Sequence, residues 1–84
     1  MTAMSNSKPR PERTDREIVA QTNALARAFY LTLGYEVPAD HRFYDFERKN
    51  YHPQERMCWD MACMAQIELT ATDPGDALDG VDDL

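Results

Sequence analysis

Apolar and polar positions follow a helical period in the first half of the chain. Thr14 and Glu17 have the spacing of a capping box, in which each side chain satisfies the other residue's backbone N–H. Gly34 suits the left-handed conformation that ends many helices. The pattern therefore predicts a helix over residues 15–33. Its apolar stripe, at intervals of three and four residues, is Ile18, Thr22, Leu25, Ala26, Phe29 and Leu33.

A second helical stretch begins at Pro53, which fits the first position of a helix because its missing N–H costs nothing there. The stretch predicts a helix over residues 53–71 with two apolar faces. One face collects Met57, Cys58, Met61, Ala65 and Leu69, with Ala62 and Met64 at its borders, and the opposite side holds Trp59, Cys63 and Ile67. Two apolar faces predict burial on two sides. The second cover is either another part of the chain, a second copy or a separate target protein.

The connection over residues 35–52 is too long for a tight turn and too aromatic for a solvated linker. Asp40 is suited to cap a short third helix there, with Phe43 and Phe46 on one side. We expect both Phe rings to pack against the two long helices. Four further residues fit either the margin of the core or a binding surface: Tyr44, Arg48, Lys49 and Tyr51.

Beyond the second helix, Asp73 is placed to cap a short turn whose first residue is Pro74. Ala77 and Leu78 then dock one more apolar patch. These elements predict an all-α fold with an antiparallel two-helix core, in a single helical domain over residues 12–79. Residues 1–11 lack periodic apolar positions and are predicted to be a disordered arm, and residues 80–84 an acidic disordered tail.

Length and charge limit the classes of function. The 84 residues allow one small domain, and a net charge of −6 argues against direct binding to nucleic acid. No apolar run approaches the ~20 residues that span a bilayer, and no signal-peptide pattern opens the chain. Residues 1–56 hold all 9 basic residues and 8 acidic ones, whereas residues 57–84 hold 7 acidic residues and no basic one. The acidic half is either a solvated tail or a surface that docks on a basic partner, such as a nucleic-acid-binding site.

Residues for catalysis or metal binding are sparse. Cys58 and Cys63 lie five positions apart, so on a helix their side chains diverge by about 140° and cannot form a mutual disulfide or share a metal. No CxxC, HxxxH, glycine-rich phosphate loop or GxSxG pattern occurs. Cys58 with His52 is a conceivable nucleophile and base, but the helical pattern buries Cys58. The sequence predicts a protein without enzyme activity, cofactor or metal, in a reducing cytoplasm.

Ten residues in the range 21–78 follow one another in this order: Leu25, Ala26, Arg27, Gly34, Tyr35, His52, Pro53, Gln54, Glu55 and Trp59. In this order, residues 21–78 resemble small uncharacterised proteins encoded in bacteriophage and prophage genomes. The resemblance implies an infected bacterial cytoplasm as the setting and supplies no catalytic residues. A second likeness is to bacterial domains related to the ryanodine-receptor repeat, from which this chain departs in its loop and at the start of the second helix.

The leading hypothesis is a non-enzymatic phage accessory protein that binds and occludes a host protein of antiviral defence or of transcription. An acidic surface would steer it to a basic groove, and aromatic or apolar residues would anchor it. One alternative is a phage structural or assembly module that self-associates through the Trp59, Cys63 and Ile67 face. Another is a small-ligand-binding oligomer that uses Arg42, Arg48 and Lys49. The predicted partner-binding residues are Tyr44, Tyr51, Trp59, Asp60, Cys63, Ile67, Glu68, Asp73 and Asp76.

Overall fold

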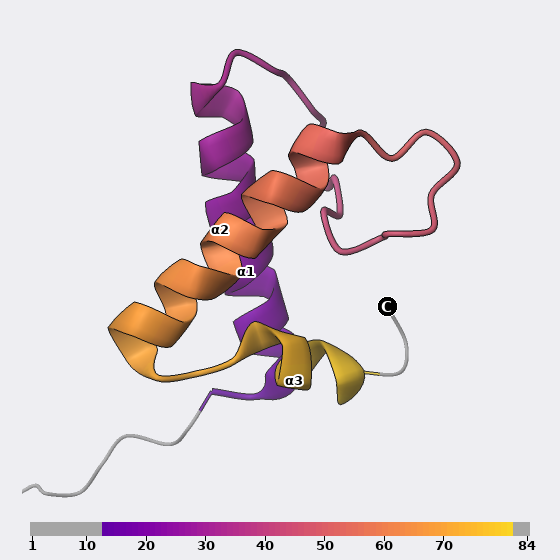
Figure 1. Cartoon of the computed structure of the whole chain (residues 1–84). Coiled ribbons are helices and arrows are strands. Elements are labelled where there is room, and N and C mark those ends of the chain that lie inside the picture. The colour runs from indigo at the N-terminus through magenta and orange to yellow at the C-terminus, as the bar shows by residue number, and fades with distance from the viewer. Residues whose placement is uncertain (1–12, 82–84) are drawn as a thin grey trace, which may run out of the picture.

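The computed structural model describes residues 13–81, and this part of the chain folds into three helices without a strand (Figure 1). They are α1 (Asp15–Thr32), α2 (Pro53–Thr70) and α3 (Pro74–Asp79). The predicted all-α fold with a two-helix core is confirmed. The arm predicted for residues 1–11 and the last three residues of the predicted tail lie outside the described residues.

Helix α1 begins and ends as the sequence predicts. The Thr14 hydroxyl accepts from the Glu17 backbone N–H, and the Glu17 carboxylate accepts from the Thr14 N–H. Gly34 has a φ of 99°, a conformation that favours glycine. The buried face is rotated slightly from the predicted stripe, since Val19 and Tyr30 are buried and Leu33 is exposed. Leu33 lies after the last turn of α1, as its C-cap residue.

The two long helices run antiparallel and cross obliquely, with α3 beside the start of α1 (Figure 1). In the middle of the crossing, the buried Gln66 amide donates to the Thr22 hydroxyl at 3.2 Å. At the end of α2, Asp73 caps α3 and Pro74 is its first residue, as predicted. Ala77 is buried and Leu78 packs against the core. A Cβ at Gly80 would displace the exposed Asp15 carboxylate, which lies close to it.

The connection over residues 35–52 contains no helix, so the short third helix predicted after Asp40 is wrong. Its backbone instead forms successive turns, with N–H donors at His41, Asp45, Arg48 and Tyr51 each bonding the carbonyl three residues earlier. The Asn23 side chain explains part of the difference. Its amide bonds the His41 carbonyl and the Phe43 N–H at 2.8 and 2.7 Å, occupying groups that a helix would use.

Candidate functional site

Helix α2 turns an unexpected side toward α1. Its buried residues are Glu55, Cys58, Trp59, Ala62 and Gln66, which we call the inner face. The three methionines that the sequence placed on or beside the core face point outward instead. Met57, Met61 and Met64, which we call the methionine face, are 42%, 41% and 65% exposed. The apolar stripe of α2 that faces solvent is therefore made of methionine.

Trp59 belongs to the core, so its predicted role as a partner-binding residue or as part of a self-association seam is wrong. Only 3% of it is exposed. The aromatic connection covers it: the Tyr44 ring lies 5.6 Å from the Trp59 ring, and Phe46 packs edge-on at 6.1 Å. The sequence left open whether Trp59 is covered by another part of the chain, by a second copy or by a target protein. In the structure, the chain itself covers Trp59.

A buried carboxylate fixes the connection to α2. Glu55 Oε1 accepts from the Arg48 guanidinium and lies 2.7 Å from His41 Nε2, and Glu55 Oε2 accepts from the His52 N–H. We call Glu55, Arg48 and His41 the Glu55 cluster. His52 in turn caps α2 by accepting from the Gln54 N–H. From the sequence, Glu55 is named only among the residues that carry the resemblance. The three-residue spacing from His52 to Glu55, which is that of a capping box, was the available signal for the bond to the His52 N–H.

The charge of Glu55 is stabilised where it lies. Burial by itself raises the pKa of this carboxyl, but the hydrogen bonds from Arg48, the His52 backbone and His41 outweigh it and leave the pKa below its ordinary value. Arg48 also lies over the Tyr51 ring, 5.3 Å from its centroid. Arg48 is thus engaged inside the molecule, which weakens its assignment to a ligand-binding site.

The predicted acidic residues are all exposed, but they are not equivalent. Asp60 pairs with Arg56 one turn earlier at 3.1 Å, and Asp73 accepts from the Gly75 N–H as the N-cap of α3. Asp76 lies in the first turn of α3, where the helix dipole favours a negative charge. Glu68 and Asp79 are exposed as well. The structure brings Glu68, Asp73, Asp76 and Asp79 to the last turn of α2 and to α3, which we call the acidic end.

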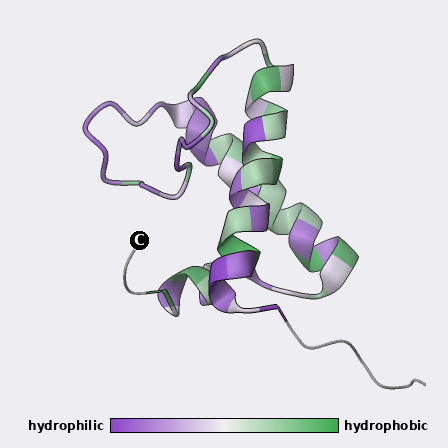
Figure 2. Cartoon of the chain, turned by 180° about the vertical axis from the view of Figure 1, so that it is seen from behind, coloured by the Kyte–Doolittle hydropathy of each residue, from purple (hydrophilic) through white to green (hydrophobic). Residues whose placement is uncertain are grey.

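The remaining predicted residues divide between core margin and surface. Tyr44 and Tyr51 are half-buried, and the Tyr51 hydroxyl donates to the Phe43 carbonyl at 2.7 Å. Burial, followed by the nearby Glu55 charge, raises the pKa of Tyr51 to about 12. Cys63 is half-buried, whereas Ile67 is exposed. Leu69, which was predicted on the same apolar face as Met57 and Met61, is 81% exposed, and Figure 2 shows hydrophobic residues reaching this last turn of α2.

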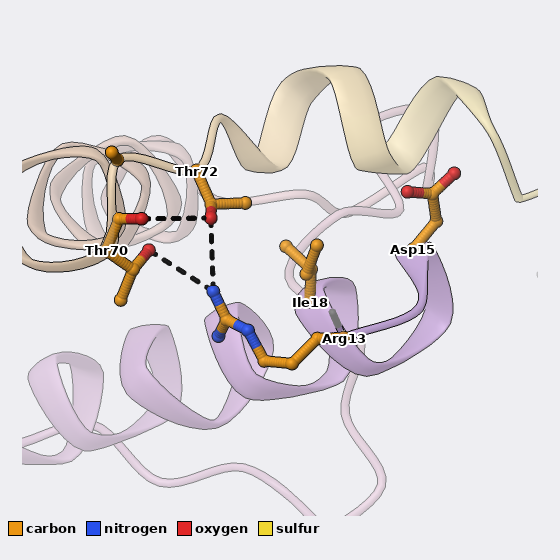
Figure 3. A pocket seen from close by; sticks show the side chains of 6 residues that line it. Arg13, Asp15, Ile18, Thr70 and Thr72 are labelled. Carbon is orange, nitrogen blue, oxygen red and sulfur yellow. Dashed lines mark hydrogen bonds between the residues drawn. The ribbon is translucent and has the colours of Figure 1, made fainter. Parts of the chain in front are cut away.

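A pocket of about 440 Å³ lies where the start of α1 meets the end of α2 (Figure 3). The Arg13 guanidinium crosses it and donates to the Thr70 and Thr72 hydroxyls, both at 3.2 Å. Arg13 also donates to Gln21. A cation at this position suits the carbonyl end of α2. The side chain therefore ties the two helices together, and its donors are already occupied by the chain.

Nucleophilic and metal-binding groups are not assembled within residues 13–81. No three His, Cys, Asp or Glu side chains of this range are arranged to hold a metal ion. Both cysteines are thiols, and burial raises the pKa of the Cys58 thiol, which disfavours the reactive thiolate. Within the same range, no helix has both the length and the apolar character needed to cross a membrane.

The comparisons with known proteins identify no relative. No family model, no curated protein and no solved structure matches the chain.

Proposed function

We propose that this chain is a non-enzymatic, phage-encoded accessory protein that binds and occludes a protein with a basic surface in the cytoplasm of an infected bacterium. The observation that carries the proposal is the acidic end. Every acidic residue from Met57 to Val81 is exposed, and no basic residue lies in that segment. Although the Arg13 guanidinium lies against Thr70 and Thr72, the four carboxylates of the acidic end outnumber it, and such an excess of negative charge steers association toward a basic partner.

Apolar anchors at the same end add to this charge. The exposed Ile67 and Leu69 flank Glu68 in the last turn of α2. The last turn of α2 thus exposes apolar and charged side chains, the two components that an interface combines, with Ile67 and Leu69 on different sides of the helix. They replace Trp59 as the proposed anchors. A protein of antiviral defence or of transcription is the host target that the resemblance to phage proteins favours.

The test compares two variants that remove the same number of charges. One is Glu68→Gln with Asp76→Asn and Asp79→Asn, which removes three of the four charges of the acidic end and leaves the Asp73 cap intact. The control is Glu36→Gln with Asp40→Asn and Glu47→Gln, three exposed acids of the connection. Each variant, tagged, is used to capture proteins from a bacterial lysate at low and at high salt.

We expect a host protein that the unaltered chain and the control retain at low salt and release at high salt, and that the acidic-end variant does not retain. Exposed charge contacts weaken with salt because the Debye length falls from about 10 Å at 0.1 M to about 3 Å at 1 M. Equal retention by the two triple variants would contradict the proposal, as would capture that does not respond to salt.

A further inference from the structure

The core of the described chain is built largely without its flexible aliphatic side chains. No leucine or methionine between residues 13 and 81 is buried. The buried apolar residues are instead small or aromatic in most cases, among them Ala26, Ala62, Cys58 and Phe43. A domain this small commonly needs an additional source of stability, and oligomerisation is one of them. The methionine face consists of exposed apolar side chains at regular helical intervals, so it is the surface that such an association would cover.

The methionine face has the spacing of a two-helix seam. Gln54, Met57, Met61, Met64 and Glu68 follow one another at intervals of three, four, three and four residues. This alternation keeps side chains on one line between two packed helices. The seam lies on a side of α2 different from the inner face, so a second helix can approach it without disturbing α1.

The seam is complementary to itself when two copies pair in opposite directions. With a two-fold axis at Met61, the Met57 side chain of one copy faces Met64 of the other. Gln54 of one copy then faces Glu68 of the other, and an amide donor meets a carboxylate acceptor. No like-charged residues face each other along the line.

The charge gradient of the chain favours the same direction. Lys49 lies before the start of the seam and Arg56 lies within its first turn, and Glu68 and Asp73 lie at or after its end. Antiparallel pairing places the basic end of one copy beside the acidic end of the other, whereas parallel pairing places like charges together. Asp60, near the two-fold axis, is already paired with Arg56. The centre of the seam therefore carries little uncompensated charge.

We infer that a second copy of this chain covers the methionine face, giving a two-fold dimer in which the two α2 helices pair antiparallel. This inference does not rest on the proposed function, although the seam ends at Glu68, which also belongs to the acidic end. Neutralising the acidic residues Asp76 and Asp79 is expected to leave the dimer intact.

The first experiment measures the oligomeric state of the full chain by sedimentation equilibrium over a range of concentrations. We expect a dimer, and we expect the combination Met57→Gln, Met61→Gln and Met64→Gln to raise its dissociation constant by roughly a hundredfold or more. Leu31→Gln is the matched control, because Leu31 is 38% exposed on α1. A chain that remains monomeric throughout, or a triple variant that dimerises like the control, overturns the inference. Circular dichroism of each variant reports whether its helices are intact.

A second experiment tests the direction of pairing without depending on the triple variant. In a Cys63→Ser background, single cysteines replace Met57, Met61 or Met64, and the chains are oxidised. We expect Met61→Cys to cross-link with itself, and a mixture of Met57→Cys and Met64→Cys chains to cross-link with each other. Efficient self-cross-linking of Met57→Cys or Met64→Cys alone would indicate parallel pairing and overturn the inferred dimer.

Discussion

The two faces of α2 differ in a way that their hydrophobicity does not explain. The inner face buries a glutamate and a glutamine beside Cys58, Trp59 and Ala62, whereas the methionine face presents three methionines to solvent. If apolar burial alone oriented the helix, the methionines would point inward. The inner face is selected because its polar groups have partners: Glu55 binds Arg48 and His41, and Gln66 binds Thr22.

The comparison teaches that specific partners outweigh the number of apolar residues in a small core. A buried carboxylate without partners costs several kcal/mol, so its partners must be in place wherever it is buried. The methionines lose less by remaining at the surface, where a second protein surface can cover them. Matched substitutions on the two faces of α2 test this interpretation.

The largest expected effect comes from removing the aromatic side chain of the inner face. Trp59→Ala should lower the free energy of unfolding by about 3–5 kcal/mol, because Trp59 is buried against Tyr44 and Phe46. Met61→Ala, about half a turn away on the methionine face, should lower the free energy of unfolding of the monomer by less than about 1 kcal/mol. Urea unfolding followed by circular dichroism at low protein concentration measures both. Comparable losses for the two variants would mean that the faces are not distinct.

The next effect concerns the charge of the inner face. Glu55→Gln should lower the free energy of unfolding by about 3 kcal/mol, because it leaves the Arg48 guanidinium without its carboxylate. Glu68→Gln removes the same charge from an exposed position of α2 and, at the low protein concentration that keeps the chain monomeric, should change stability by less than about 0.5 kcal/mol. Urea unfolding midpoints of the two variants measure this difference in stability. An unfolding curve of Glu55→Gln that superimposes on that of Glu68→Gln would show that the cluster does not orient α2.

The same pair of variants carries a pH test. The pKa of Glu55 lies below its ordinary value of 4.5 in the folded chain. Its ionised form therefore stabilises the fold above that ordinary pKa, and this contribution disappears as the pH falls through the lower, folded-state pKa. The stability difference between the unaltered chain and Glu55→Gln should be constant near neutral pH and shrink in acid. A stability difference between the two chains that grows as the pH falls would contradict the lowered pKa of Glu55.

The smallest expected effect separates the two thiols. Burial, followed by Asp60 and Asp73, raises the pKa of Cys63 from 9.0 to about 11. At mildly alkaline pH its thiolate fraction is then roughly a hundredfold below that of an ordinary cysteine, so iodoacetamide should modify it slowly. Cys58 is fully buried on the inner face and should react only when the chain unfolds. Mass spectrometry of timed samples resolves the two sites, and modification of Cys58 before Cys63 would contradict the burial of Cys58 on the inner face.

The helices and their ends could be predicted because their signals are local. Capping residues, a proline at a first helical turn and a glycine at a last one act through neighbouring backbone groups. The buried Phe43 was predicted as well. The binding surface was harder to predict. Trp59 and the methionines both recur at helical intervals, so periodicity could identify two faces of α2 but not rank them.

The two long helices with their ends, the acidic charge of the second half and the excess of apolar surface on α2 follow from the amino-acid sequence alone. Which surface of α2 remains exposed follows only from the tertiary contacts. Glu55 meets Arg48 and His41, and Trp59 meets Tyr44 and Phe46, through contacts between residues 7 to 15 positions apart on different elements. Such contacts depend on how the connection folds over α2, and no local pattern encodes that path. The physical reason is that a helix is stabilised within itself, whereas its orientation is set by the partners that its side chains meet.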